Sequence, residues 1–297
     1  MKKYIGIDLG GTSIKYGLVD ETGELSKVNQ FSTPKNKTDL LTKLSLIIHE
    51  YQQNFNIEGI GISVPGVVQA DGFLTTAGAI QCLYGINLKT TLEELVNIPV
   101  QIENDANAAA IAEKWLGNAK GIHNYLTLVL GTGVGGAIVI NDQIYRGSHA
   151  RSGEFGWMII ENDDIDIEMG SLNFRGATVI GLIRRYNQFS SDPVDDARLI
   201  FKRAKENETL AQNILTSFYH SLAKGIINLI VSFDPEMVVI GGGISANELF
   251  IKELISTIKS IKNNHNSINN LDFPPVIAAK LGNNAGIIGA VYQLINR

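Results

Sequence analysis

Short alternating runs of hydrophobic and polar residues, typical of β-strands, are separated by longer segments with helical spacing. Residues 105–117 are rich in alanine and predict a helix that begins where a strand ends. In the first third of the chain, the strand-like runs are 4–11, 15–20, 58–66 and 99–105. Residues 37–55 predict a helix with one hydrophobic face, formed by Leu40, Leu44, Ile47, Ile48 and Tyr51.

The same alternation starts again near residue 119. Strand-like runs at 125–133 and 136–142 precede a long helical region at about 208–232 and a buried-looking strand at 237–243. A polar loop at 263–275 and a final helix at 284–297 complete the pattern. Strands that alternate with helices predict an α/β fold. We expect two domains: a smaller one of residues 1–118, joined by the C-terminal helix 284–297, and a larger one of residues 119–283.

Composition narrows the class of protein. The chain has 297 residues, 44% of them hydrophobic, and a net charge of −5, with no basic patch to bind nucleic acid. Its single cysteine, Cys82, allows neither an internal disulfide nor a thiolate metal site. No apolar run reaches the ~18 to 20 residues of a membrane span, and residues 1–3 lead directly into a strand rather than a signal peptide. We therefore expect a cytoplasmic enzyme with neither a membrane nor a nucleic-acid partner.

A glycine-rich hairpin occurs twice. Residues 5–20 read IGIDLGGTSIKYGLVD, and residues 130–142 read LGTGVGGAIVIND. Turns of Gly and Thr let backbone N–H groups approach phosphate oxygens closely, so two such turns could hold a triphosphate from both sides of a cleft. Asp8, at the end of the first strand, is then placed to hold Mg²⁺ through water. For one loop alone, an ordinary β-turn explains the sequence equally well, but the second copy favours phosphate binding.

Two further glycine clusters need separate interpretation. GTGVGG matches the dinucleotide fingerprint at Gly131, Gly133 and Gly136, but that fingerprint requires a following helix. The next residues are β-branched and predict a strand, which excludes a dinucleotide fold. The third cluster ends the strand 237–243 and is expected to form a wall for a nucleotide; its residues are Gly241, Gly242 and Gly243.

Asn104 and Asp105 stand where the strand 99–105 meets the next helix, a position at which open α/β sheets present their chemistry. Asp105 has two interpretations that the sequence leaves open. It can be the N-cap of the helix. It can also be a general base that takes the proton of a sugar hydroxyl, kept ionised by the helix dipole. Asn104 carries both a donor and an acceptor for a neighbouring hydroxyl.

Taken together and in order, these motifs resemble the ROK sugar kinases, a family of the actin-like and hexokinase-like ATPase superfamily. The match runs through IGIDLGGTSIKYGLVD, GISVPG, IENDANAAA, LGTGVGGAIVIND, GSHARSGEFGWM, VVIGGGIS and NNAGIIGA. The resemblance implies two actin-like, ribonuclease H-like domains around a nucleotide and sugar cleft, with ATP and Mg²⁺ as cofactors and a homodimer as the assembly. It implies Asp105 as the base and Asn104, Glu154 and Gly66 beside the sugar. The phosphate loops it implies are Asp8, Gly10, Gly11, Thr12 and Lys15, followed by Thr132 and Gly133.

The chain departs from the family at one place. Typical members carry G-E-x-G-H and C-x-C-G-x-x-G-C-L-E segments that together bind structural zinc. Here Trp157 replaces the histidine, Ser171 a cysteine and Asn173 the glutamate. We therefore expect no zinc site, and we expect Trp157 and Asn173 to contact the substrate instead.

The favoured function is an ATP-dependent sugar kinase that phosphorylates the 6-hydroxyl of a β-glucoside such as cellobiose, or of a hexose. An indole at position 157 could stack on a second sugar ring, which favours the glycoside. Trp157 could equally fill the space left by zinc, in which case the substrate is glucose or N-acetylmannosamine. A sugar-responsive transcriptional regulator would carry a DNA-binding segment before the first phosphate loop, where only four residues precede Ile5. A non-catalytic actin-like scaffold leaves Asn104, Asp105 and Glu154 unexplained.

Overall fold

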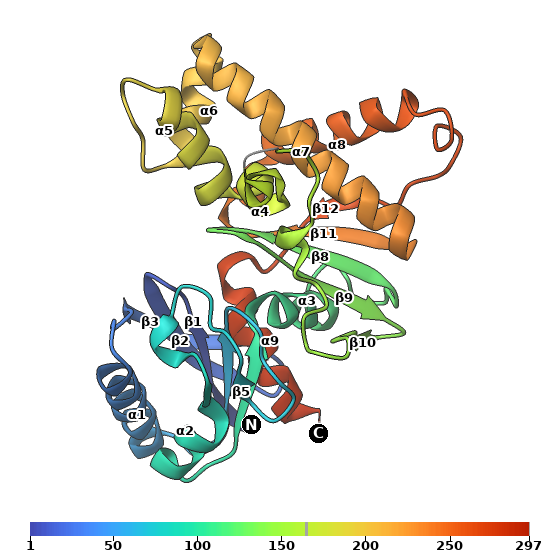
Figure 1. Ribbon diagram of the computed structural model, residues 1–297. Coiled ribbons are helices and arrows are strands. Elements are labelled where there is room, and N and C mark those ends of the chain that lie inside the picture. Colours follow the sequence, from blue (N-terminus) through green and yellow to red (C-terminus); the bar gives the residue numbers. More distant parts are fainter. Residues whose placement is uncertain (164–165, 297) are drawn as a thin grey trace. The chain divides into compact units, whose positions relative to one another are not determined.

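The computed structural model describes residues 1–163 and 166–296, and its chain divides into two compact units (Figure 1). Unit 1 contains Met1–Gly121, Gln143–Ser152 and Asn283–Arg297. Unit 2 contains Ile122–Asp142 and Gly153–Gly282. Residues 143–152, which lie inside the expected second domain, group with unit 1, and the expected division of the chain into domains stays a prediction.

Unit 1 is built on a five-stranded sheet with the strand order β3-β2-β1-β4-β7. Strands β1, β2 and β3 form an antiparallel meander, whereas β1, β4 and β7 are parallel neighbours. The carboxyl ends of these three parallel strands therefore meet at one edge of the sheet. The strands are β1 (Lys3–Leu9), β2 (Ser13–Asp20), β3 (Leu25–Ser32), β4 (Ile57–Val64) and β7 (Val100–Asn104).

Two pairs of helices accompany this sheet (Figure 1). Helices α1 (Lys37–Asn54) and α2 (Leu88–Val96) pack their apolar residues onto the isoleucines of β1 and β4. Helices α3 (Asp105–Trp115) and α9 (Ala285–Ile295) pack against each other, and α9 also contacts β1 and β4. Glycine permits this close packing, because a Cβ on Gly61 would lie 2.4 Å from the carbonyl oxygen of Ala290. The remaining short strands of unit 1 are β5 (Phe73–Leu74), β6 (Ile86–Asn87) and β10 (Gln143–Ile144).

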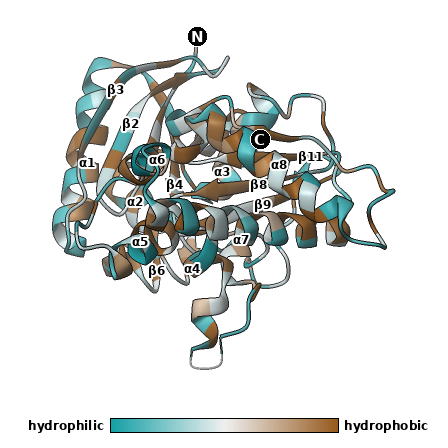
Figure 2. Cartoon of the chain, turned by 90° about the horizontal axis from the view of Figure 1, so that it is seen from above, coloured by the Kyte–Doolittle hydropathy of each residue, from teal (hydrophilic) through white to brown (hydrophobic). Residues whose placement is uncertain are grey.

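Unit 2 has its own sheet, in which its strands follow the order β9-β8-β11-β12. Strand β9 is antiparallel to β8, and β8, β11 and β12 are parallel. The long helix α7 (Thr209–Phe233) and α8 (Glu248–Asn263) pack against one another beside this sheet (Figure 1). Hydrophobic residues, brown in Figure 2, are concentrated on central strands such as β8, as expected for the core. The strands are β8 (Tyr125–Leu130), β9 (Val134–Ile140), β11 (Met237–Gly241) and β12 (Val276–Ala278).

The rest of unit 2 is a set of short helices between β10 and α7. After a 3₁₀ turn at Phe155–Trp157 come α4 (Leu172–Gly176), a π-helical turn (Thr178–Ile183), α5 (Arg184–Phe189) and α6 (Ala197–Lys205). Further 3₁₀ turns lie at Gln81–Leu83 in unit 1, at Ile167–Gly170 and Gly243–Ala246 in unit 2, and at Gly282–Asn284.

Most predicted elements are confirmed. The helices at 37–55, 105–117 and 208–232 and the strand at 237–243 lie within a few residues of α1, α3, α7 and β11. The helix expected at 284–297 is α9, except that residue 297 lies outside the described part of the chain. Sequence analysis missed β3, because its burial pattern is largely exposed and gives little hydrophobic alternation.

Among the described residues, α7 has the length and composition to cross a membrane. However, 61% of its most apolar window is buried inside the protein. A buried core helix passes the same test, so α7 gives little support to a membrane span.

Candidate active site

The shared edge of β1, β4 and β7 gathers polar side chains in unit 1. Asp8 is opposite Ser63 in the β1–β4 register, and Ser63 is opposite Glu103 in the β4–β7 register. The buried Ser63 hydroxyl donates to Asp8 Oδ1 over 2.5 Å. Helix α9 begins beside this pair, since a Cβ on Gly286 would lie 2.7 Å from Asp8 Oδ1. This is the edge at which parallel sheets place their ligands.

Asp8 is a carboxylate held in a poorly solvated place. Burial raises its pKa above the ordinary value of 3.8, while the Ser63 hydrogen bond and the charge of Lys15 act in the opposite direction. Lys15 lies opposite Asp8 in the β1–β2 hairpin, which explains this influence. The carboxylate consequently lacks full compensation for its charge within the protein.

Asn104, not Asp105, is the N-cap of α3. Its Oδ1 accepts from the Asn107 amide over 3.0 Å, and Asp105 is the first residue of the helix. The Asn104 Nδ2 group donates to Gly66 O over 2.9 Å and to Asp105 Oδ1 over 3.2 Å. The helix-cap interpretation of Asp105 is therefore wrong, and its role as a general base stays a prediction. Asn104 retains one lone pair on Oδ1 with which it could accept from a ligand hydroxyl.

Asp105 has the environment of a proton acceptor. Its Oδ1 also accepts from the Ala106 amide over 2.8 Å, which fixes the carboxylate at the start of α3. Burial, reinforced by the negative charge of Asp8, raises its pKa from 3.8 to about 6. A carboxylate with a pKa near the working pH is a more effective general base than an ordinary aspartate.

Gly66 holds the Asn104 side chain from the end of β4. Its φ is +94°, in the left-handed region, and a Cβ there would lie 2.7 Å from the Thr76 carbonyl oxygen. No L side chain fits this position without strain. Gly66 thus allows the chain to turn so that its carbonyl oxygen accepts from Asn104 Nδ2.

The first glycine turn joins β1 to β2. The Gly10 amide donates to Ser13 O over 3.1 Å, and the Thr33 hydroxyl donates to Gly10 O over 2.6 Å. Gly11 packs tightly too, because a Cβ on it would lie 2.6 Å from the Cβ of Ala79. Thr12 accepts at its carbonyl from the Thr33 amide over 3.0 Å. The turn is thus rigid and free of bulky side chains, as a phosphate loop requires.

The second glycine turn joins β8 to β9 in unit 2. The Gly131 amide donates to Gly133 O over 3.0 Å, and β9 follows directly, which confirms that the G-x-G-x-x-G match is no dinucleotide fingerprint. The π-helical turn begins against this loop: the amides of Thr178 and Ile180 donate to Gly131 O and Thr132 O over 3.1 and 3.2 Å.

A cavity of about 900 Å³ lies in unit 2 beside this turn. Gly242 adopts φ +86°, and a Cβ on it would lie 2.2 Å from the Leu130 carbonyl oxygen, so glycine is required where β11 passes the turn. The lining combines Gly131, Thr132 and Gly243 with larger residues. The apolar ones are Val179, Ile183, Phe201 and Ile244, and the polar ones are Thr178, Asp195, Asp196, Arg198 and Asn247. An apolar slot next to glycine turns suits the base and sugar of a nucleotide.

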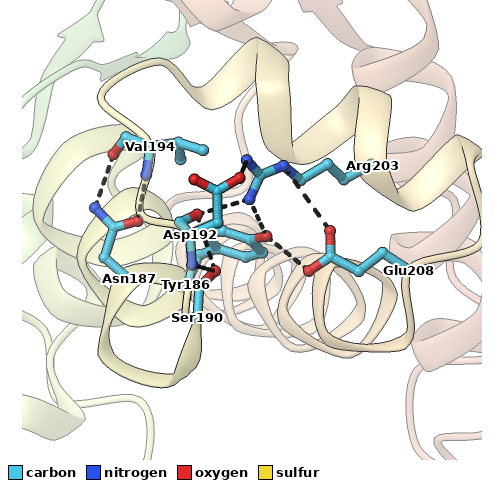
Figure 3. Close-up of polar contacts among 7 residues, drawn as sticks. All are labelled: Tyr186, Asn187, Ser190, Asp192, Val194, Arg203 and Glu208. Carbon is cyan, nitrogen blue, oxygen red and sulfur yellow. Dashed lines mark hydrogen bonds and ion pairs between the residues drawn. The ribbon is translucent and has the colours of Figure 1, made fainter.

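The loop between α5 and α6, which carries Asp195 and Asp196, is held by a polar cluster (Figure 3). Arg203 donates to the Tyr186 hydroxyl over 2.6 Å and to the Asp192 carbonyl over 2.7 Å. Tyr186, fully buried, donates in turn to Glu208 over 2.6 Å. Asn187 exchanges two hydrogen bonds with the backbone of Val194. One rim of the cavity is thus built on a fixed loop.

The residues expected to replace the zinc segment also lie in unit 2. Trp157 ends a 3₁₀ turn and is 54% exposed, whereas Glu154 precedes that turn and is half-buried. Asn173 accepts at Oδ1 from the Val134 amide over 2.7 Å, and a Cβ on Gly156 would lie 2.2 Å from this oxygen. Asn173 therefore fixes the start of β9. A contact between Asn173 and a sugar stays a proposal.

Ser171 is buried and caps α4, its Oγ accepting from the Phe174 amide over 3.5 Å. Over residues 1–163 and 166–296, the structure contains no group of three or more His, Cys, Asp or Glu side chains arranged to hold a metal. Cys82 packs at the edge of the hydrophobic core of unit 1, as a small core residue does.

Several residues of these sites carry no signal that was recognised in the sequence. Ser63 lies inside the motif GISVPG and could have been found from the parallel register with Asp8. Glu103 and Arg146 form an ion pair across 43 residues of sequence, which no local pattern reveals. The rim of the cavity, residues 195–198, carries no motif.

The chain resembles known proteins over its whole length. A model of the ROK family matches residues 4–297. A β-glucoside kinase of Listeria monocytogenes is 34% identical over 298 residues, covering 99% of this chain and 97% of that protein. The solved structure of a candidate N-acetylmannosamine kinase from Listeria monocytogenes has a TM-score of 0.88 and 33% identity, covering 99% of both chains. A ROK family glucokinase from Streptomyces griseus, in complex with glucose and AMPPNP, has a TM-score of 0.84 and 26% identity, covering 98% of both chains. These structures confirm the predicted α/β fold of two actin-like domains.

Proposed function

The chain belongs to the ROK family and is an ATP-dependent carbohydrate kinase, and from this premise we propose that it phosphorylates the 6-hydroxyl of a β-glucoside such as cellobiose. The observation that carries the chemical part is Asp105, whose pKa is raised to about 6 at the edge where β1, β4 and β7 end. The observation that carries the substrate part is the exposed indole of Trp157.

Asp105 serves as the general base in this proposal. It removes the proton of the sugar hydroxyl as the oxygen attacks the γ-phosphorus, and ADP leaves with the electron pair of the broken P–O bond. Asn104 and Glu154 hold neighbouring hydroxyls of the sugar, and Gly66 keeps the Asn104 amide in place through its carbonyl. Such positioning of the acceptor contributes to rate independently of the base.

The phosphates of ATP are assigned to the two glycine turns. In unit 1 these are Gly10, Gly11 and Thr12 with Lys15, and in unit 2 they are Thr132 and Gly133. The adenosine is assigned to the 900 Å³ cavity whose wall includes Gly243, next to Gly241 and Gly242. This assignment is supported by chemistry: a triphosphate needs cationic partners and backbone N–H groups, and a base needs an apolar slot.

Mg²⁺ fits the acidic edge of unit 1. The negative charge of Asp8 disfavours the charged form of Asp105, and a divalent cation would relieve that repulsion. Asp8 would hold the ion through water, since Mg²⁺ keeps much of its hydration shell. When bound, Mg²⁺ neutralises and orients phosphate oxygens. No zinc is part of the proposal.

Trp157 supplies the argument for a glycoside. A half-exposed indole next to Glu154 offers an apolar face on which a second sugar ring or an aglycone can stack. Glucose and N-acetylmannosamine, the alternative substrates, have no second ring to use that surface. The similarity to a β-glucoside kinase over 99% of the chain supports the same choice.

The experiment compares ADP release with cellobiose, glucose and N-acetylmannosamine under identical conditions. We expect kcat/KM to be highest for cellobiose, and Trp157→Ala to lower it for the disaccharide by roughly tenfold, the worth of about 1.4 kcal/mol of stacking. The same substitution should leave glucose within about twofold by the same reasoning. Preference for N-acetylmannosamine by an order of magnitude would exclude the glycoside, and no ADP release with any sugar would favour a regulator instead.

The proposal extends to a homodimer that acts in the cytoplasm, the assembly implied by the family. Light scattering on the purified protein measures the assembly directly. A mass of one chain would contradict it.

A further inference from the structure

Glu103 is a fully buried carboxylate next to the proposed base. It is the next-to-last residue of β7, just before Asn104 and Asp105, and none of its surface is exposed to solvent. An ionised carboxylate in such a place is costly unless it is paired and hydrogen-bonded on both oxygens. Glu103 therefore needs a countercharge and hydrogen-bond donors around both of its oxygens.

Arg146 provides the countercharge in a two-pronged ion pair. Its Nη1 donates to Glu103 Oε1 over 2.8 Å and its Nη2 to Oε2 over 2.5 Å. Gln293, from α9, also donates to Oε2, and its own oxygen accepts from Gln101 Nε2 over 2.8 Å. Glu103 thus joins three segments of unit 1 that are distant in sequence: the β7–α3 junction, residues 143–152 and α9.

The remaining contacts of Glu103 act on the junction itself. Oε1 accepts from the Asn104 backbone amide over 2.9 Å and from the Asn107 side chain over 3.0 Å. These two donors stand on either side of Asp105, one residue before it and two after it. Any rotation of α3 about its first turn would break at least one of these bonds, so the carboxylate fixes the direction in which Asp105 points.

We propose that Glu103 and Arg146 are positioning residues that hold Asp105 in its reactive orientation. This rests on the proposed role of Asp105 as the base. Arg146 donates to both oxygens of Glu103 and fixes the orientation of this carboxylate. Glu103 in turn accepts hydrogen bonds from the first turn of α3 and the residue before it. Displacement of a base by about 1 Å lowers the rate by on the order of 10²-fold. Correct positioning of Asp105 is therefore a functional reason for the protein to bury the charge of Glu103.

The segment that carries Arg146 belongs to the same unit as the Asp105 junction, since residues 143–152 group with unit 1. The ion pair thus anchors this segment to the junction within unit 1. Loss of Arg146 should consequently affect turnover more than ATP affinity.

The test uses Arg146→Lys, which keeps the charge but loses the two-pronged geometry, and Glu103→Gln, which keeps the shape but loses the charge. The matched control is Glu113→Gln near the other end of α3, where an equally buried carboxylate accepts from the Asn118 amide over 2.9 Å. We expect both positioning variants to lower kcat by roughly 10- to 100-fold with the KM for ATP within about twofold. Glu113→Gln should retain kcat even where it lowers the melting temperature.

Hydrogen exchange gives a readout independent of activity. The amides of Asn104 and Asn107 should lose protection in the Arg146→Lys variant and keep it in the Glu113→Gln variant. If folded Arg146→Lys and Glu103→Gln proteins turn over at the wild-type rate while Asp105→Asn is inactive, the positioning role is wrong and the base is not. If Asp105→Asn itself keeps normal turnover, there is no base to position and both proposals fall.

Discussion

Replacement of Asp105 by Asn separates a catalytic carboxylate from a structural one, because the two roles predict opposite changes in stability. The amide keeps the oxygen that accepts from the Ala106 amide and removes only the charge. As the base, Asp105 should be needed for turnover, and its loss should lower kcat by roughly 10²- to 10⁴-fold. ATP binding should persist, since the proposed phosphate turns are untouched.

The magnitude of the stability change follows from the pKa. Raising it from 3.8 to about 6 means that the folded protein disfavours the charged carboxylate by about 3 kcal/mol. Because the folded state binds more protons than the unfolded state between these two pKa values, this contribution lowers the free energy of unfolding as pH rises from about 4 to about 6. This shift already includes the favourable hydrogen bonds of the carboxylate to the amides at the start of α3, which lower the pKa. Asp105→Asn should therefore be more stable than wild type by up to about 3 kcal/mol at pH 7.5.

The assay is a pair of thermal melts, at pH 7.5 and pH 4, with steady-state ADP release alongside. At pH 7.5 the variant should melt several degrees higher, and at pH 4 the difference should vanish because wild-type Asp105 is then protonated. In the wild type, kcat/KM should fall about tenfold for each pH unit below about 6, as the base becomes protonated.

Asp39→Asn is the matched control. Asp39 is also an acid in the first turn of a helix, but it is exposed on α1, where its carboxylate accepts from the side chain of the neighbouring Asn36. Asp39→Asn should lower the free energy of unfolding by up to about 1 kcal/mol and leave kcat unchanged. An Asp105→Asn protein that is active and less stable than wild type at pH 7.5 would refute the reasoning and return Asp105 to a structural role.

Three further predictions address the cavity and the metal. Gly242→Ala should destabilise unit 2 by about 1 to 3 kcal/mol through strain, whereas Gly243→Ala, with open space at its Cβ, should cost much less in the same thermal melts. Tyr186→Phe removes the hydroxyl between Arg203 and Glu208; titration should show weaker ATP binding, with unchanged KM for the sugar, because the rim loop loosens. Chelation should abolish activity and Mg²⁺ should restore it, while elemental analysis of the untagged protein finds no stoichiometric zinc; tightly bound zinc at one ion per chain would contradict the interpretation of Ser171 and Asn173.

Local sequence patterns determined much of the secondary structure of this protein. Glycine turns followed by β-branched residues required two hairpins rather than a dinucleotide fold, since backbone freedom and side-chain branching act within a few residues. The strand–helix junction at Asn104 and Asp105 was visible for the same reason. The sequence could not decide which of these two residues caps the helix, because both types do so; the backbone of Asn104, which is extended, decided it.

Only the tertiary structure decided the electrostatics and the support of the site. The raised pKa of Asp105 comes from burial and from Asp8, 97 residues earlier in the chain, which become neighbours through the parallel register of β1, β4 and β7. The same holds for Glu103 and Arg146, whose pairing depends on a segment returning to unit 1. The energy of a charge depends on its distance from other charges and on its exposure to water, and the sequence alone gives neither quantity.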